Sequence, residues 1–180
     1  MNILDLILAD QNQGALKELS QNFDLSERET RTAVEELIPA LRRGMANNTS
    51  SAPGLDDLLD ALKTGEHAKY MDQPSSLGKT STVKDGNDIL GHVFGSKEVS
   101  REVANRVSKK SGISSAILKK MLPIVATLAM SALSKKVIGG RSGSVNRNQS
   151  GGLLTSLLDS DGDGSMWDDV LGMAAKTMLR

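Results

Sequence analysis

The second half of this 180-residue chain repeats the arrangement of apolar residues in its first half. An apolar residue and a serine lead into a stretch that ends on two apolar residues and a proline, first over residues 25–41 and again over 113–125. The two copies differ by four residues, about one helical turn. Further on, three leucines and an aspartate recur 99 positions later, with Leu55, Leu58, Leu59 and Asp60 matched by Leu154, Leu157, Leu158 and Asp159. A repeat of helical core positions constrains the fold strongly and says little about what the protein acts on.

The sequence predicts an all-α fold, because no stretch shows sustained period-two alternation rich in β-branched residues. We expect two related helical subdomains that arose by internal duplication, either sharing one core or forming two. The predicted divisions are an N-terminal helical repeat (1–64), a flexible linker (65–85), a second helical repeat (86–138), a Gly/Ser-rich linker (139–152) and a C-terminal helix-loop-helix (153–180).

Helix start and stop signals support these divisions. Ser26, with Glu29 three residues later, has the form of a capping box and predicts a helix that runs from there to about Arg43. In the second repeat, Ser96 is a candidate N-cap and Gly112 a candidate helix stop.

Composition excludes several classes of protein. The chain has no cysteine and two histidines, which disfavours a structural zinc site and suits a reducing compartment. With four aromatic residues, a stacking platform for single-stranded nucleic acid is also disfavoured. The longest apolar run, residues 121–133, is shorter than the roughly 20 residues of a membrane span. We therefore expect a cytoplasmic protein with a buried core helix and no membrane span.

Several motifs carry a resemblance to a known group of proteins. They are Ile89-Leu90-Gly91-His92-Val93-Phe94-Gly95-Ser96, Gly112-Ile113-Ser114, Lys119-Lys120-Met121-Leu122-Pro123, and the aspartate-rich stretch 161–172. In these the chain resembles the bacterial domain-of-unknown-function families grouped with the YidB-like proteins. The resemblance implies a small helical bacterial protein and supplies no catalytic residues.

The sharpest chemical motif is the loop from Asp159 to Ser165. Aspartates at its positions 1, 3 and 5 and a glycine at position 6 match the first half of an EF-hand calcium loop. The pattern then departs, because position 12, where a glutamate belongs, is Val170, and a shortened loop would have to close on Asp169. The candidate calcium ligands are Asp159, Asp161, Asp163 and Asp169. Alternatively, the same residues only cap a helix that begins near Met166.

The second feature that bears on function is the uneven distribution of charged residues along the chain. Residues 97–147 hold eleven basic and two acidic side chains, although the whole chain has a formal net charge of zero. Because this segment also reads as helix, turn, helix, it could contact DNA phosphates. The candidate contacts are Lys109, Lys110, Lys119 and Lys120. The second helix, however, lacks the Arg, Asn or Gln that read bases, so the alternative is a solvated basic face or one that complements the acidic N-terminal half.

No set of residues in the sequence points to a catalysed reaction. Adjacent acids such as Glu35-Glu36 point in different directions on a helix, and no serine lies in a Gly-x-Ser-x-Gly elbow. We therefore predict a non-enzymatic interaction or scaffold protein whose partner is another protein or a second copy of the chain. DNA binding is the first alternative and calcium binding is the second. No small-molecule substrate is indicated.

Overall fold

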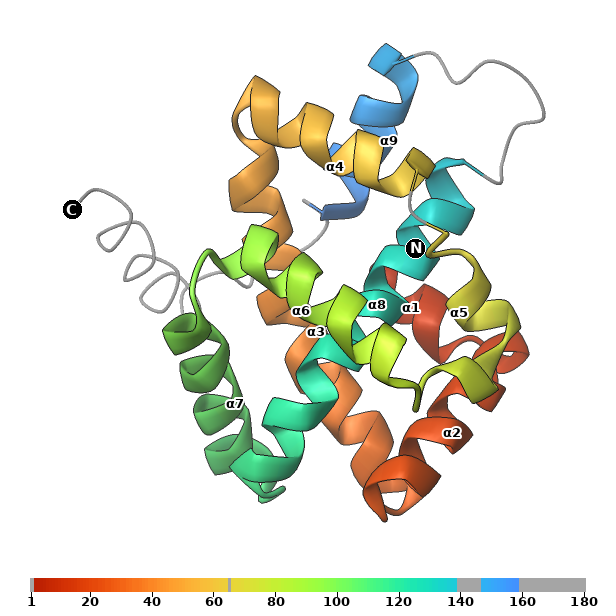
Figure 1. Cartoon of the computed structure of the whole chain (residues 1–180), viewed down its shortest axis with the longest axis vertical. Coiled ribbons are helices and arrows are strands. Elements are labelled where there is room, and N and C mark those ends of the chain that lie inside the picture. The colour runs from red at the N-terminus through yellow and green to blue at the C-terminus, as the bar shows by residue number, and fades with distance from the viewer. Residues whose placement is uncertain (1, 65, 139–146, 159–180) are drawn as a thin grey trace.

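The computed structural model describes residues 2–64, 66–138 and 147–158, and within these ranges it contains helices and no strand, which confirms the all-α prediction (Figure 1). The elements in chain order are α1 (Ile3–Leu8), η1 (Asp10–Asn12), α2 (Gln13–Phe23), α3 (Glu27–Thr49), α4 (Ala52–Thr64), α5 (Lys69–Asp72), η2 (Pro74–Ser76), α6 (Thr80–Phe94), α7 (Lys97–Ser111), α8 (Ser115–Val137) and α9 (Arg147–Leu158).

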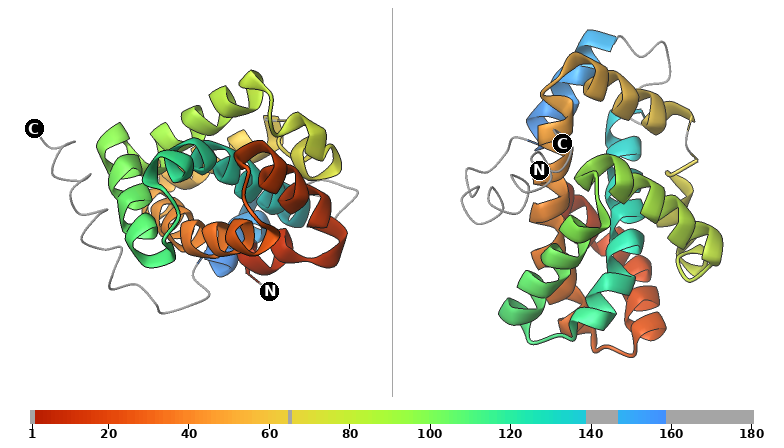
Figure 2. Two further views of the ribbon diagram at one scale, coloured as in Figure 1. Left: turned by 90° about the horizontal axis from the view of Figure 1, so that it is seen from below. Right: turned by 60° about the vertical axis from the view of Figure 1, so that its left-hand side comes forward.

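Helix α8 lies at the centre of the molecule. Every residue from Met121 to Ser134 is buried, so the helix is apolar on all sides rather than on one stripe. Its neighbours are α6, α7, α3 and α1, and α6 makes the most extensive contact (Figure 2). Helix α8 is long and apolar enough to span a membrane, with a mean hydropathy of 1.6 over its most apolar 18-residue stretch. However, 78% of that stretch is buried inside the protein.

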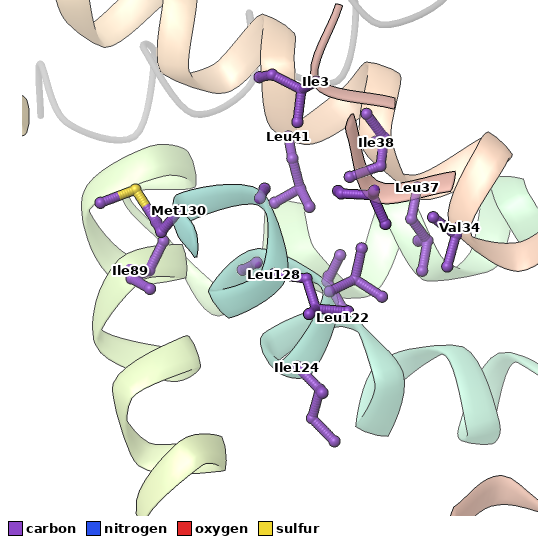
Figure 3. Close-up of a cluster of buried hydrophobic side chains, with 14 of the residues drawn as sticks. Ile3, Val34, Leu37, Ile38, Leu41, Ile89, Leu122, Ile124, Leu128 and Met130 are labelled. Carbon is purple, nitrogen blue, oxygen red and sulfur yellow. The ribbon is translucent and has the colours of Figure 1, made fainter. Parts of the chain in front are cut away.

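One hydrophobic core joins the two predicted subdomains. Ile3, Leu37 and Leu41 from the first half meet Leu122 and Leu128 from the second half in the same cluster of buried side chains (Figure 3). The choice between one core and two, which the sequence left open, is thus decided in favour of one for the part of the chain that is described.

The turns before the two longest helices share one local structure. In the first turn, Asp24 adopts the left-handed conformation with φ 52°, and Ser26 caps α3. In the second, Gly112 does so with φ 77° and precedes α8, whose N-cap residue, Ser114, makes no side-chain capping hydrogen bond, unlike Ser26. Helices α3 and α8 are both 23 residues long and both contain a proline. These similarities are local, and internal duplication stays a prediction.

The capping signals in the sequence are confirmed at two helices. The Ser26 hydroxyl accepts from the Glu29 amide at 3.1 Å, and the Glu29 carboxylate accepts from the Ser26 amide at 2.9 Å. At α7, the Ser96 hydroxyl accepts from the Val99 amide. Helix α3 extends beyond the predicted end near Arg43 to Thr49, because its last turns pack against α4 and α6 and tertiary contact outweighs the weak helix propensity of Asn and Thr.

The structure differs from the predicted flexible linker over 65–85. The described residues 66–85 contain α5, η2 and the first turn and a half of α6, and Tyr70, Met71 and Leu77 from this segment are buried. Side chains of α8 hold it in place: the Ser131 hydroxyl donates to the Ala68 carbonyl at 3.1 Å and accepts from the Met71 amide at 3.2 Å. The polar composition that suggested a linker therefore belongs to the outer side of an anchored segment.

One other predicted boundary also differs from the structure. The predicted second linker, 139–152, overlaps α9, which already begins at Arg147. Residues 159–180, including the candidate calcium ligands and the helix predicted near Met166, lie outside the described residues.

Candidate functional site: a basic groove beside the α6–α8 crossing

Helix α6 crosses α8 at unusually close range. A Cβ atom placed on Gly86 would lie 2.0 Å from the carbonyl oxygen of Pro123 and 2.4 Å from its carbonyl carbon, so only glycine fits here without displacement. A similar close approach holds α6 against α3, since a Cβ on Gly44 would lie 2.5 Å from Cγ1 of Val93. Figure 1 shows α6 passing in front of α8. Two hollows flank this crossing, and together they form one groove.

The first hollow, called the α7 hollow, lies where α6, the α6–α7 turn, α7 and α8 meet, and has a volume of about 660 Å³. Leu90 and Leu122, both part of the core, form its apolar floor. The remaining lining residues are small or polar: Asn87, Gly91, Gly95, Ser96, Lys97, Glu98, Ser100, Arg101 and Lys119. Because these residues lie on three packed helices and one turn, the hollow has a defined shape.

The second hollow, called the α2 hollow, lies on the other side of the crossing and has a volume of about 470 Å³. It shares Asn87 and Lys119 with the α7 hollow, so the two adjoin. Its other lining residues are Asn22, Phe23, Gly78, Val83, Lys120, Pro123 and Ile124. We refer to the two hollows together as the basic groove.

The charge of the groove is positive. Among the residues that line it, Lys97, Arg101, Lys119 and Lys120 are basic and Glu98 is acidic. Arg101 and Glu98 approach to 3.8 Å, but both side chains are largely exposed, so this pair neutralises little of the field. The groove also includes the N-terminal end of α7, whose helix dipole adds partial positive charge. An anionic group is therefore favoured along this surface.

The structure separates the four predicted phosphate contacts. Lys119 and Lys120 line the groove, as the first exposed turns of α8 before it enters the core. Lys110 instead points toward α3, where its Nζ atom lies 2.8 Å from Oε2 of Glu36. Lys109 is exposed near the end of α7 and lines neither hollow.

Sequence reasoning did not single out Lys97, Arg101 or Asn87 as site residues. The first two lie inside the predicted basic segment, but nothing in their spacing shows that α7 and α8 diverge and leave a hollow between them. Asn87 lies on α6, a helix whose polar start was predicted to be linker. The crossing at Gly86 is the signal that was missed, since a glycine in a helix often marks close backbone contact.

A second polar cluster lies on the segment between α4 and α6. The Tyr70 hydroxyl donates to the carboxylate of Asp85, and burial together with that carboxylate raises the pKa of Tyr70 to about 12. Burial also lowers the pKa of His67, whose ring lies 6.3 Å from that of Tyr70 between centroids. Tyr70 lines neither hollow of the groove. Its hydrogen bond ties α5 to α6, so this cluster has a structural explanation.

The candidate calcium ligands cannot be placed, because all four lie beyond Leu158, the last described residue. In the part of the chain that is described, no three His, Asp or Glu side chains gather as a metal site would require.

Fold and site together define a small all-helical protein that is organised around one buried helix and carries a basic groove beside it. The groove residues all come from the first 124 positions of the chain. The chain belongs to a family of bacterial proteins of unknown function, DUF937, whose model matches residues 5–136. This confirms the resemblance to a bacterial domain of unknown function, while the grouping with the YidB-like proteins stays a resemblance. No curated protein and no solved structure matches the chain.

Proposed function

We propose that this protein is a non-enzymatic interaction module that binds an acidic, amphipathic segment of a partner protein in the basic groove. The observation that carries the proposal is the combination of a positive rim with an apolar floor. Lys97, Arg101 and Lys119 stand above the buried Leu90 and Leu122 in the α7 hollow. In the α2 hollow, Lys119 and Lys120 stand beside the partly exposed Phe23 and Val83. A partner helix with apolar side chains on one face and carboxylates beside them has the matching chemistry.

Rigidity of the groove also supports this proposal. Helices α6 and α8 meet at backbone contact at Gly86, and α6 is also held near its C-terminal end, where Val93 packs against Gly44 of α3. A preformed groove costs less conformational entropy on binding than one that must be ordered first. The described residues therefore offer a ready surface for a partner.

DNA binding remains the second candidate because exposed lysines continue beyond the groove. Lys109 lies near the end of α7, and Lys119 and Lys120 lie on the first turns of α8. Sequence-specific reading in the major groove is disfavoured, since every residue of α8 from Met121 to Ser134 is buried and this stretch has no free face to insert. This candidate is therefore restricted to contacts with phosphates, which carry no base specificity.

Fluorescence anisotropy separates the two candidates. The probes are a labelled peptide helix with a Leu/Trp stripe flanked by aspartates, the same peptide scrambled so that the stripe is lost, and a labelled 20-base-pair DNA duplex. We expect the full chain to bind the amphipathic peptide more tightly than either other probe. The Arg101→Glu, Lys119→Glu double variant should lose about tenfold in affinity, since each rim charge contributes roughly 0.5–1 kcal/mol.

The matched control is Lys136→Glu, which reverses an exposed lysine near the other end of α8 that lines neither hollow. Equal effects of the control and the double variant would show that net charge, not the groove, governs binding. Tighter binding of the duplex than of the peptide would replace the proposal with the phosphate-binding candidate.

A further inference from the structure

The basic groove and the end of the chain carry opposite charges. Residues 159–180 contain five aspartates against Lys176 and Arg180, whereas the groove carries four basic residues against Glu98. This segment follows directly after α9. Charge complementarity favours contact between the two, and the covalent tether gives the segment a high effective concentration near the groove.

The segment also has the apolar pattern that the floor of the groove requires. Written on a helix, Trp167, Val170, Leu171, Ala174 and Met178 follow the i, i+3, i+4, i+7, i+11 spacing and share one narrow face. Asp168 and Asp169 fall beside and behind that face. The sequence therefore combines an apolar stripe with one adjacent carboxylate, Asp168, and with further aspartates in the preceding stretch 159–163, which is the chemistry proposed above for a partner of the groove.

The tether is long enough for this contact. Leu158, the last residue of α9, is buried in the core, so the start of the segment is fixed to the body of the protein. In extended form the seven residues 159–165 would reach about 25 Å, and in helical form residues 166–178 would add about 20 Å. The sum is comparable with the diameter of about 40 Å expected for a domain of this size.

We infer that residues 159–180 dock in the basic groove of their own chain and compete there with external acidic partners. The inference rests on the proposed function, because it gives the groove the same kind of ligand and adds a competitor that is always present. Docking in this way is autoinhibitory, because a partner must first displace the segment. The apparent affinity for the partner is then reduced in proportion to the fraction of molecules whose groove is free. The Asp168→Asn, Asp169→Asn variant should therefore bind the amphipathic peptide severalfold more tightly than the unmodified chain.

A direct test uses the full chain, in which Trp167 is the sole tryptophan and no cysteine is present. A cysteine introduced as Ser100→Cys, on α7 in the α7 hollow, carries a dansyl acceptor for energy transfer from Trp167. The matched control carries the same acceptor at Glu35→Cys, an exposed position on α3 that lines neither hollow.

We expect strong transfer to position 100, weak transfer to position 35, and loss of the difference in the Arg101→Glu, Lys119→Glu background. The difference should also fall at about 1 M salt, where the screening length is about 3 Å. Equal transfer to both positions overturns docking. If the peptide probe still binds the groove in that case, the proposed function stands without the inference; if the peptide does not bind, both fail. Transfer that rises with protein concentration overturns docking in the same chain and assigns the contact to a second copy.

Discussion

Replacing Gly86 by alanine tests the close crossing on which the groove depends. The new Cβ would lie 2.0 Å from the Pro123 carbonyl oxygen and 2.8 Å from its Cα, all of it backbone that no rotamer change can move. Reaching ordinary van der Waals separation requires α6 to shift by about 1.5 Å. Because α6 has its most extensive contact with α8, the shift also loosens buried Ile89 and Phe94.

The magnitude follows from two opposing effects. Overpacking costs roughly 1–3 kcal/mol, and this site belongs at the upper end because both partners are main chain. Replacing a glycine within a helix by alanine stabilises the protein by about 1 kcal/mol, because alanine has the higher helix propensity. The net expectation for Gly86→Ala is a loss of about 2 kcal/mol, or about 4–8 °C in Tm for a chain of this length.

Gly91→Ala is the matched control, because Gly91 lies on the same helix, is exposed, and has nothing within 4 Å of its added Cβ. It should gain the helix propensity without the clash and raise Tm by about 2–4 °C. Thermal unfolding followed by circular dichroism at 222 nm measures both variants. Equal Tm values for Gly86→Ala and Gly91→Ala would refute the reasoning, since the crossing would then leave room for a methyl group at both positions.

Three further predictions concern other parts of the chain. Ser131→Ala should destabilise the protein by about 1–3 kcal/mol in urea unfolding, because it leaves the Met71 amide and the Ala68 carbonyl without their partner. The control, Ser81→Ala on the exposed face of α6, should change stability by less than about 0.5 kcal/mol. Equal effects of the two substitutions would contradict the anchoring role of Ser131. Burial lowers the pKa of His67, so its contribution to stability is fully present above the unfolded pKa near 6.5 and is lost as the pH falls below that value. The free energy of unfolding should therefore decline more steeply from pH 8 to 5.5 for the unmodified chain than for His67→Gln. Parallel curves would contradict the assignment. A calcium loop formed by Asp159, Asp161, Asp163 and Asp169 should give saturable calcium binding in calorimetry and a change in Trp167 fluorescence on adding calcium. Both signals should disappear in Asp161→Ala. An absence of binding heat up to about millimolar calcium would leave these residues as a helix cap.

Much of the local structure follows from the sequence because it depends on neighbours along the chain. A capping box needs residues three apart, and Ser26 with Glu29 forms one as predicted. A left-handed residue before a new helix likewise depends on local sterics, and Gly112 ends α7 as predicted. The segregation of basic residues into 97–147 is also a property of the sequence alone, as is membership of the DUF937 family.

Tertiary structure decided the rest, because it depends on which distant residues meet. The segment predicted as a linker is anchored by Ser131 of α8, more than fifty residues away, and no local pattern encodes that partner. Lys110 is indistinguishable from Lys119 in the sequence, yet one pairs with Glu36 and the other lines the groove. The groove itself exists because Gly86 lets α6 lie against the α8 backbone. Sequence thus determined the all-α class, the capped helix starts and where charge accumulates, whereas the packing of α6 on α8 determined which of those charges share a surface.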